Sequence, residues 1–136
     1  MKNKILLSLF TALALAGCAT QEGAYEPRHT TGGDLENTRN VVLMDQAVQN
    51  SVTTAGMQEN ILPDGRFEVV ANLRNRLERR IQVQVSCVFK DARGFSTGDE
   101  TPWQNLILTE KTQESVRFIS ANNKAQRYTI RVRQAH

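Results

Sequence analysis

Few residues of this chain combine the types and spacings that catalysis or metal binding needs. The two histidines are His29, in a polar N-terminal segment, and His136, the last residue. Acid–base catalysis usually needs a histidine or carboxylate that the fold holds in place, and neither histidine has such a position. Cys18, His29, Cys87 and His136 also lack the clustered spacing of metal ligands. The sequence therefore predicts no metal site and no cofactor.

Ser96 has surroundings that superficially resemble those of a catalytic nucleophile. It lies between Gly94 and Gly98, as the serine of a nucleophile elbow does. That elbow joins a strand to a helix, however, and here both the helix and a structured base are missing from the pattern. No glycine-rich phosphate loop occurs in the predicted domain either. We expect a protein that is not an enzyme.

The N-terminal residues indicate export and anchoring, centred on Cys18. Lys2 and Lys4 precede an apolar run over residues 5–16, which suits a signal peptide and is short for a membrane-spanning helix of ~20 residues. The run ends in Leu-Ala-Gly-Cys at 15–18, which resembles a bacterial lipobox. Such signals are cleaved before a cysteine whose thiol carries diacylglycerol and whose amino group is usually acylated. An ordinary cysteine behind a cleavable signal peptide is the alternative.

This signal predicts a lipoprotein of the bacterial cell envelope, bound to the membrane through acyl chains on Cys18. Ala19, rather than an aspartate, follows the cysteine. In enteric-type sorting this predicts the outer membrane, with the domain facing the periplasm. An envelope location excludes nucleic acid as a partner.

The predicted organisation has three parts. Residues 1–17 form the signal peptide, residues 18–39 form a lipid-anchored flexible tether, and residues 40–136 form one folded domain. The tether is poor in large apolar residues, so it buries too little surface to offset its ordering entropy.

The domain is predicted to be all-β, because apolar residues alternate over short segments between turn signals. The clearest strands cover residues 67–73, 81–89, 115–120 and 127–133, with shorter ones at 41–44 and 103–108. Residues 46–58 are ambiguous, and we favour an irregular or strand-like segment because of their Val-Thr-Thr content. Turns are expected at 62–65 and 91–94. About six or seven strands indicate an antiparallel, immunoglobulin-like β-sandwich, with a small barrel as the alternative.

Charge is distributed unevenly, although the net charge of the whole chain is only +3. The first half of the mature chain is acidic and the second half is basic and rich in arginine. Arg127, Arg131 and Arg133 are expected on one face of the last strand, and Trp103 lies near a strand start. This possible interaction surface could attract a polyanion. The alternatives are that the charges pair within the domain, or that they protect an edge strand from association.

The order of the features in residues 40–134 resembles the YcfL-like family of small proteobacterial lipoproteins. The resemblance rests on the lipobox, the strand and turn at 83–94 ending in Phe-Lys-Asp-Ala-Arg-Gly, the later Trp103, and the Ser-Ala-Asn step at 120–122 before the last strand. It implies an immunoglobulin-like sandwich on a lipid anchor, with no catalytic residue. The strand around Cys87 is less aromatic than the resemblance implies.

We therefore expect a non-enzymatic accessory or binding module with a protein partner in the periplasm. The alternative is a binder of an envelope polyanion, lipopolysaccharide or peptidoglycan, through the arginine-rich strand face. Cys87 lies within an apolar alternation and is expected to be buried.

Overall fold

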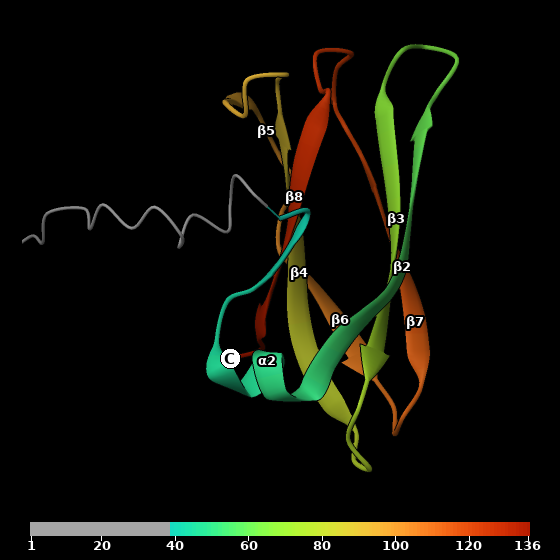
Figure 1. The fold of residues 1–136 in the computed structure, drawn as a ribbon, viewed down its shortest axis with the longest axis vertical. Helices are drawn as coiled ribbons and strands as arrows, with labels where there is room; N and C mark the ends of the chain where they lie inside the picture. Colours follow the sequence, from blue (N-terminus) through green and yellow to red (C-terminus); the bar gives the residue numbers. More distant parts are fainter. Residues whose placement is uncertain (1–38) are drawn as a thin grey trace, which may run out of the picture.

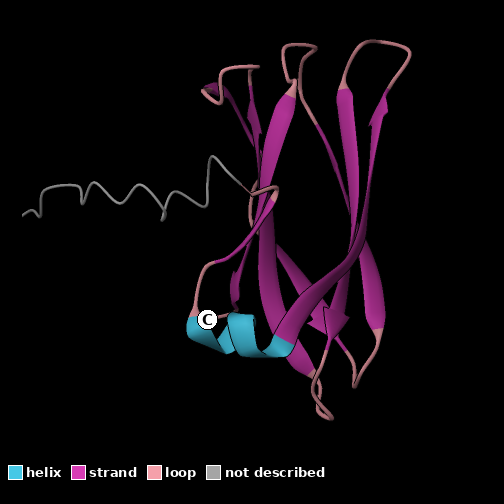
Figure 2. Ribbon diagram, in the orientation of Figure 1, coloured by secondary structure: helices cyan, strands magenta, loops and turns pink. Residues whose placement is uncertain are grey.

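Two β-sheets face each other across a single core in the computed structural model, which describes residues 39–136 (Figures 1 and 2). Within these residues there are eight strands and one short helix. The predicted β-sandwich is thus confirmed and the barrel alternative is excluded. The number of strands exceeds the expected six or seven, mainly because residues 96–100 pair as a strand although they contain no large apolar side chain.

The larger sheet, sheet A, has the order β1-β8-β4, and β4 pairs on its other edge with both β5 and β6. The smaller sheet, sheet B, has the order β2-β3-β7. Pairing is antiparallel, as predicted, except that β1 runs parallel to β8. The strands are β1 (Val41–Leu43), β2 (Val52–Ile61), β3 (Phe67–Asn75), β4 (Ile81–Lys90), β5 (Ser96–Glu100), β6 (Gln104–Leu108), β7 (Gln113–Ile119) and β8 (Arg127–Gln134).

The core consists of the side chains that the predicted alternation places inward. Phe67 on β3 lies between the sheets, with its ring centroid 6.4 Å from that of Phe89 and 5.7 Å from that of Tyr128. Such tilted and edge-to-face ring pairs stabilise a core beyond the area they bury. The other buried inward residues of the long strands are Val69, Ala71, Leu73, Val83, Val85, Cys87, Val116, Phe118, Ile130 and Val132.

Both predicted turns are present, and each uses a glycine with positive φ. Gly65 has φ 86° and Gly94 has φ 87°, a region that glycine enters without steric cost. In the second turn the Asp91 side chain accepts hydrogen bonds from the backbone N–H groups of Arg93 (2.9 Å) and Phe95 (3.0 Å). These bonds close the turn between β4 and β5.

The prediction for residues 46–58 was wrong for its first part. Gln46–Ser51 form a helix, α2, and only from Val52 onward is the segment a strand. The helix begins because Asp45 caps it: one carboxylate oxygen accepts from the Val48 N–H (2.9 Å) and the other from the Gln134 N–H (2.7 Å). Asp45 therefore ties α2 to the end of β8. No helix within residues 39–136 is long and apolar enough to cross a membrane.

Candidate functional site

Trp103 and two arginines of β8 form a stack on the outer face of sheet A. The Arg133 guanidinium carbon lies 3.9 Å from the centre of the Trp103 ring, and that of Arg131 lies 5.2 Å away. A guanidinium over an indole face is a favourable cation–π arrangement. Three of the four residues predicted as an interaction surface are thus brought together, and we name them the arginine–tryptophan stack.

A break in the edge strand next to β4 places Trp103 in this stack. β5 and β6 both pair with β4, and residues 101–103 between them leave the ladder. Thr101 anchors the break, since its N–H donates to the Cys87 carbonyl and its hydroxyl accepts from the Cys87 N–H, both at 2.9 Å. Pro102 lacks an N–H donor and suits such an interruption.

The arginines of the stack are engaged by other side chains. Arg131 forms an ion pair with Glu100 and a 3.3 Å hydrogen bond to the Ser86 hydroxyl, and its side chain is only 18% exposed. Its Nε is buried and has no hydrogen-bond partner among the described residues. Arg133 donates through Nε to the Gln84 side chain at 2.9 Å. These contacts leave little of the Arg131 guanidinium for an external anion.

The outer face of β4 differs from its predicted pattern. The outward positions of this strand were expected to be largely wet, yet Ser86 and Val88 are buried and Lys90 is only 7% exposed. Ser86 lies beneath Arg131, and the Lys90 ammonium donates to the Thr129 hydroxyl at 2.9 Å. The second half of β4 is therefore buried on both faces.

Arg127 lies apart from the stack. It pairs with Lys90 at the opposite end of β8, four residues from Arg131, or roughly 13 Å along the strand. It lines a separate small cavity with Arg39 and Asn40. The predicted surface of Arg127, Arg131, Arg133 and Trp103 is thus not one continuous patch.

The remaining candidates from the sequence show no catalytic arrangement. Cys87 is buried as predicted, and burial raises the pKa of its thiol to about 12. Ser96 is exposed on β5, where its hydroxyl accepts from the Gly98 N–H at 3.2 Å, and His136 is exposed at the chain end. Within residues 39–136 no three potential ligands cluster around a metal position. Cys18 and His29 lie outside the described residues.

The edge of sheet B formed by β2 is exposed along most of its length. Met57, Glu59 and Ile61 pair with inward residues of β3, so they lie on the core-facing side of the sheet. All three are nevertheless exposed, and Ile61 is 64% exposed. The opposite edge, β1, spans only three residues and does not cover them. We name this region the β2 flank.

A cavity and a polar bridge mark the β2 flank. The cavity has a volume of about 350 Å³ and lies between residues 39–41 and β2, where Thr54 and Met57 line it. Tyr128 on β8 donates its hydroxyl to the Glu59 carboxylate at 2.9 Å, and so links the two sheets across the opening. Burial and this carboxylate both raise the pKa of Tyr128 far above its ordinary value.

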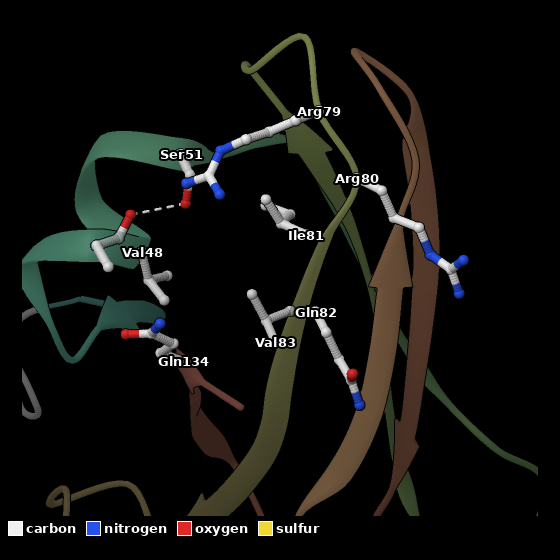
Figure 3. A pocket seen from close by; sticks show the side chains of 9 residues that line it. Val48, Ser51, Arg79, Arg80, Ile81, Gln82, Val83 and Gln134 are labelled. Atoms are coloured by element: carbon white, nitrogen blue, oxygen red, sulfur yellow. Dashed lines mark hydrogen bonds between the residues drawn. The ribbon is translucent and has the colours of Figure 1, made fainter. Parts of the chain in front are cut away.

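A groove of about 180 Å³ lies at the end of the sandwich, between α2 and the start of β4. We name it the basal groove. Val48, Ile81 and Val83 point into it, and Figure 3 shows the Arg79 side chain reaching across toward Ser51 while Arg80 points away. The Ser51 hydroxyl donates to the Ala47 carbonyl at 2.7 Å, within α2.

A buried asparagine positions the loop that carries Arg79. The Asn75 amide donates to the Arg79 carbonyl at 2.7 Å and to the Thr109 carbonyl at 3.0 Å, and its oxygen accepts from the Leu77 N–H at 2.9 Å. A fully buried amide with several partners rigidifies the loop. The Arg79 side chain is therefore presented from a fixed backbone.

The fold defines a small β-sandwich domain of two sheets, with the arginine–tryptophan stack, the β2 flank and the basal groove on its surface. The chain belongs to the family described as "Protein of unknown function (DUF1425)", which matches residues 39–134. The search of curated proteins gave no match.

Two solved structures are similar to this chain, each with a TM-score of 0.57. The crystal structure of Campylobacter jejuni cj0090 is 17% identical, and the match covers 71% of this chain and 98% of that one. The crystal structure of a DUF1425 family member from Shewanella sp. pv-4 is 23% identical, and the match covers 62% of this chain and 79% of that one. At these identities the likeness supports the fold alone.

Sequence reasoning missed the β2 flank and the basal groove as sites. For the flank a signal was present: the strand contains Thr54, Met57 and Ile61 but no proline, lysine or arginine to protect an edge. For the groove the only local signal is the cluster of arginines at 74–80; its other wall could not be foreseen, because α2 and the start of β4 are about 30 residues apart and meet only in the fold.

Proposed function

We propose that the chain is a non-enzymatic binding module of the bacterial cell envelope, a lipoprotein of the YcfL-like kind, which recognises a protein partner through the β2 flank. The lipobox at 15–18 supports lipidation of Cys18, and Ala19 supports delivery to the outer membrane on the periplasmic side. The proposal concerns a domain whose described part offers edges and grooves rather than clustered reactive groups.

The open edge of β2 is the observation that carries this proposal. β2 is ten residues long and, within residues 39–136, pairs only with β3, so no strand of the described part of the chain covers the backbone groups of its other edge. An edge of this length is a template for an added strand. Glu59 is its only charged side chain, and the Tyr128 hydroxyl already binds that carboxylate.

The partner segment that fits this edge is an extended peptide with apolar side chains at alternate positions. Main-chain hydrogen bonds would supply affinity, because β-strand addition uses the same ladder as the sheet itself. The exposed side chains of Met57 and Ile61 would supply specificity, since residues two or four apart on a strand face the same side. The cavity beside Met57 gives room for one such side chain.

The arginine–tryptophan stack supports a polyanion binder less well. An anion site needs guanidinium groups that can turn toward the ligand, whereas Arg131 is held by Glu100 and Ser86 and Arg133 by Gln84 and Trp103. Binding lipopolysaccharide or peptidoglycan would also weaken steeply with salt. Binding of a protein partner along the edge of β2 would not weaken steeply with salt.

Site-specific photo-crosslinking in intact cells tests the proposal. A photo-reactive residue at Gln58, on β2, is compared with one at Arg93, which is exposed in the turn between β4 and β5. The expected result is one reproducible protein product from position 58 that is absent from position 93. Cys18→Ala shows whether the product requires the anchor.

Two further results would contradict the proposal. One is an equal yield of the same products from both positions, which would indicate random collisions. The other is no protein product from position 58 together with salt-sensitive retention of the protein on purified lipopolysaccharide or peptidoglycan, reduced by Arg131→Ala plus Arg133→Ala. That result would assign binding to the polyanion.

A further inference from the structure

Met57 on β2 has a sulfur atom that lies next to a hydroxyl group, in a position that oxidants can reach. The Tyr128 hydroxyl lies 3.6 Å from the Met57 sulfur and donates to the Glu59 carboxylate at 2.9 Å. Met57 is 43% exposed, and the cavity of the β2 flank opens beside it. These three side chains therefore form a surface cluster in which the sulfur is accessible.

Met44 provides a comparison within the same domain. It is 48% exposed, slightly more than Met57, and its sulfur has no hydrogen-bond partner within residues 39–136. Exposure alone would therefore make Met44 the more readily oxidised of the two. Any preference for Met57 has to come from its neighbours.

The Tyr128 hydroxyl has one proton and two acceptors within reach. A carboxylate is a strong acceptor and a thioether is a weak one, so the proton is bound mainly by Glu59. Oxidation converts the sulfur of methionine into a polar sulfoxide, which carries an oxygen acceptor. Because the sulfur itself lies 3.6 Å from the hydroxyl, an oxygen bonded to it can come within hydrogen-bond distance of Tyr128.

We propose that Met57 is a site of oxidation by peroxides, assisted by the Tyr128 hydroxyl, and that its sulfoxide takes the Tyr128 hydrogen bond from Glu59. A lone pair of the sulfur attacks one oxygen of hydrogen peroxide, and the S–O bond forms as the O–O bond breaks. The departing hydroxide takes the proton of the transferred hydroxyl and leaves as water. The sulfur thus loses two electrons and the peroxide gains them. The oxygen left on the sulfur carries partial negative charge, and Tyr128 is in place to donate to it.

The exchange of partners would alter the β2 flank, and this consequence alone rests on the proposed function. The sulfoxide makes an apolar side chain polar, and the Glu59 carboxylate loses the hydroxyl that now donates to it. A polar group and a more exposed charge on an edge strand disfavour the addition of another strand. Oxidation of Met57 should therefore weaken binding of the partner.

Oxidation kinetics of the full-length chain, as the cell processes it and held in lipid nanodiscs, test the site. The chain is treated with hydrogen peroxide, and samples are quenched with catalase at intervals. Peptide mass spectrometry then gives the fraction of sulfoxide at Met57 and at Met44. We expect Met57 to be oxidised at least threefold faster than Met44.

Two variants of the cluster distinguish assistance by the hydroxyl from exposure alone. Tyr128→Phe keeps the ring between the sheets and removes the hydroxyl, so oxidation of Met57 should slow at least threefold. Glu59→Gln weakens the competing acceptor, so oxidation of Met57 should be as fast or faster. Met44 is the internal control, and its oxidation should not change measurably in either variant. Thermal unfolding by circular dichroism confirms that each variant is folded.

The inference is overturned if Met57 is oxidised no faster than Met44, or if Met57 is oxidised in Tyr128→Phe as fast as in the unchanged chain. It is also overturned if Glu59→Gln slows the oxidation of Met57 as much as Tyr128→Phe does, because loss of the competing acceptor should not slow it.

The effect on partner binding is measured separately, as the yield of the product crosslinked from position 58 before and after peroxide treatment. The yield should fall in the unchanged chain and stay constant in Met57→Leu, which cannot form the sulfoxide. An equal fall in both would overturn the link between oxidation and binding. Absence of any product from position 58, even before oxidation, would remove the proposed function and leave the oxidation site standing.

Discussion

Strands β4 and β2 have the same length, ten residues, and opposite surroundings. The second half of β4 is buried on both faces, whereas β2 is exposed on both faces from Thr54 onward. β4 alternates apolar with polar residues in its first half, whereas the polar residues of β2 occur in runs at 53–54 and 58–60, so composition accounts for part of the difference. The cover accounts for the rest. Sheet B covers the inner face of β4 and Arg131 of the stack covers Ser86 on its outer face, whereas within residues 39–136 only a three-residue strand lies opposite β2.

The two strands differ in how much they contribute to packing. β4 pairs with three other strands and is the central element of sheet A. A buried position on it contributes to stability through packing. β2 contributes less packing and keeps backbone groups open to the outside. Substitutions should therefore separate stability, on β4, from association, on β2.

The largest expected effect concerns the core side of β4. Phe89 is fully buried against Phe67, and truncation to alanine leaves a cavity. Phe89→Ala should lower the free energy of unfolding by about 3–5 kcal/mol, as measured by urea titration. Phe95→Ala is the matched control, because Phe95 is 68% exposed and its loss should change stability by less than about 0.5 kcal/mol. Equal effects would mean that β4 is not packed as described.

The second-largest effect is a loss of stability at high pH, which comes from the buried Cys87 thiol on β4. Burial raises the pKa of the Cys87 thiol to about 12, so the unfolded chain loses this proton first, near pH ~8.5. The protonated Cys87 thiol makes its full contribution to stability below that pH, and this contribution declines as the pH rises toward 12. Between pH 8.5 and 10 it should fall by roughly 1.5 kcal/mol.

Urea titrations at these two pH values measure this decline, and Cys87→Ala should remove it. The upper limit of pH 10 keeps Tyr128, whose pKa is also raised, from contributing strongly. A decline of the same size in Cys87→Ala would show that other groups cause it.

A smaller effect is expected for the arginine–tryptophan stack on the outer face of sheet A. A double-mutant cycle of Trp103→Ala and Arg133→Ala should give a coupling energy of about 0.5–1 kcal/mol, the usual range for an accessible cation–π pair. A cycle of Trp103→Ala with Arg127→Ala should give a coupling near zero, because Arg127 lies at the other end of β8. Equal couplings would contradict the stack.

The smallest effect on stability is expected on β2. Ile61→Lys places a charge on an exposed edge, so the free energy of unfolding should change by less than about 0.5 kcal/mol. The same charge disfavours addition of a strand, and the crosslinked product from position 58 should decrease strongly. An unchanged yield with unchanged stability would place the interface elsewhere.

The strands that the sequence predicts correctly are those in which a strict two-residue alternation reflects burial on one face. Phe67 to Leu73 and Tyr128 to Val132 are examples, because each inward residue is apolar or aromatic. β5 was missed because Ser96–Glu100 contain no apolar residue, and the partner strand alone makes them a strand. Helix α2 was missed because its six residues span too little for a period, although Asp45 is a cap signal.

The candidate sites were less predictable than the strands. The spacing of Arg131 and Arg133 placed them correctly on one face, but their contact with Trp103 depends on the break at Thr101. The burial of Ser86 depends on Arg131 of the arginine–tryptophan stack, and Lys90 is buried beside Thr129 of the neighbouring strand; neither has a signature in its own strand. Local pattern predicts which face a residue occupies, and tertiary contacts decide whether that face is covered.

The parallel pairing of β1 with β8 also has a consequence for the order of folding. Val41 pairs with Ile130, 89 residues later in the chain, so the first strand of the domain can pair only after the last strand is available. The β2–β3 hairpin can form early from neighbouring residues, whereas sheet A closes only when the whole chain is present. The domain therefore matures as a unit after synthesis, and a chain shortened at its C-terminal strand would keep β1 without a partner.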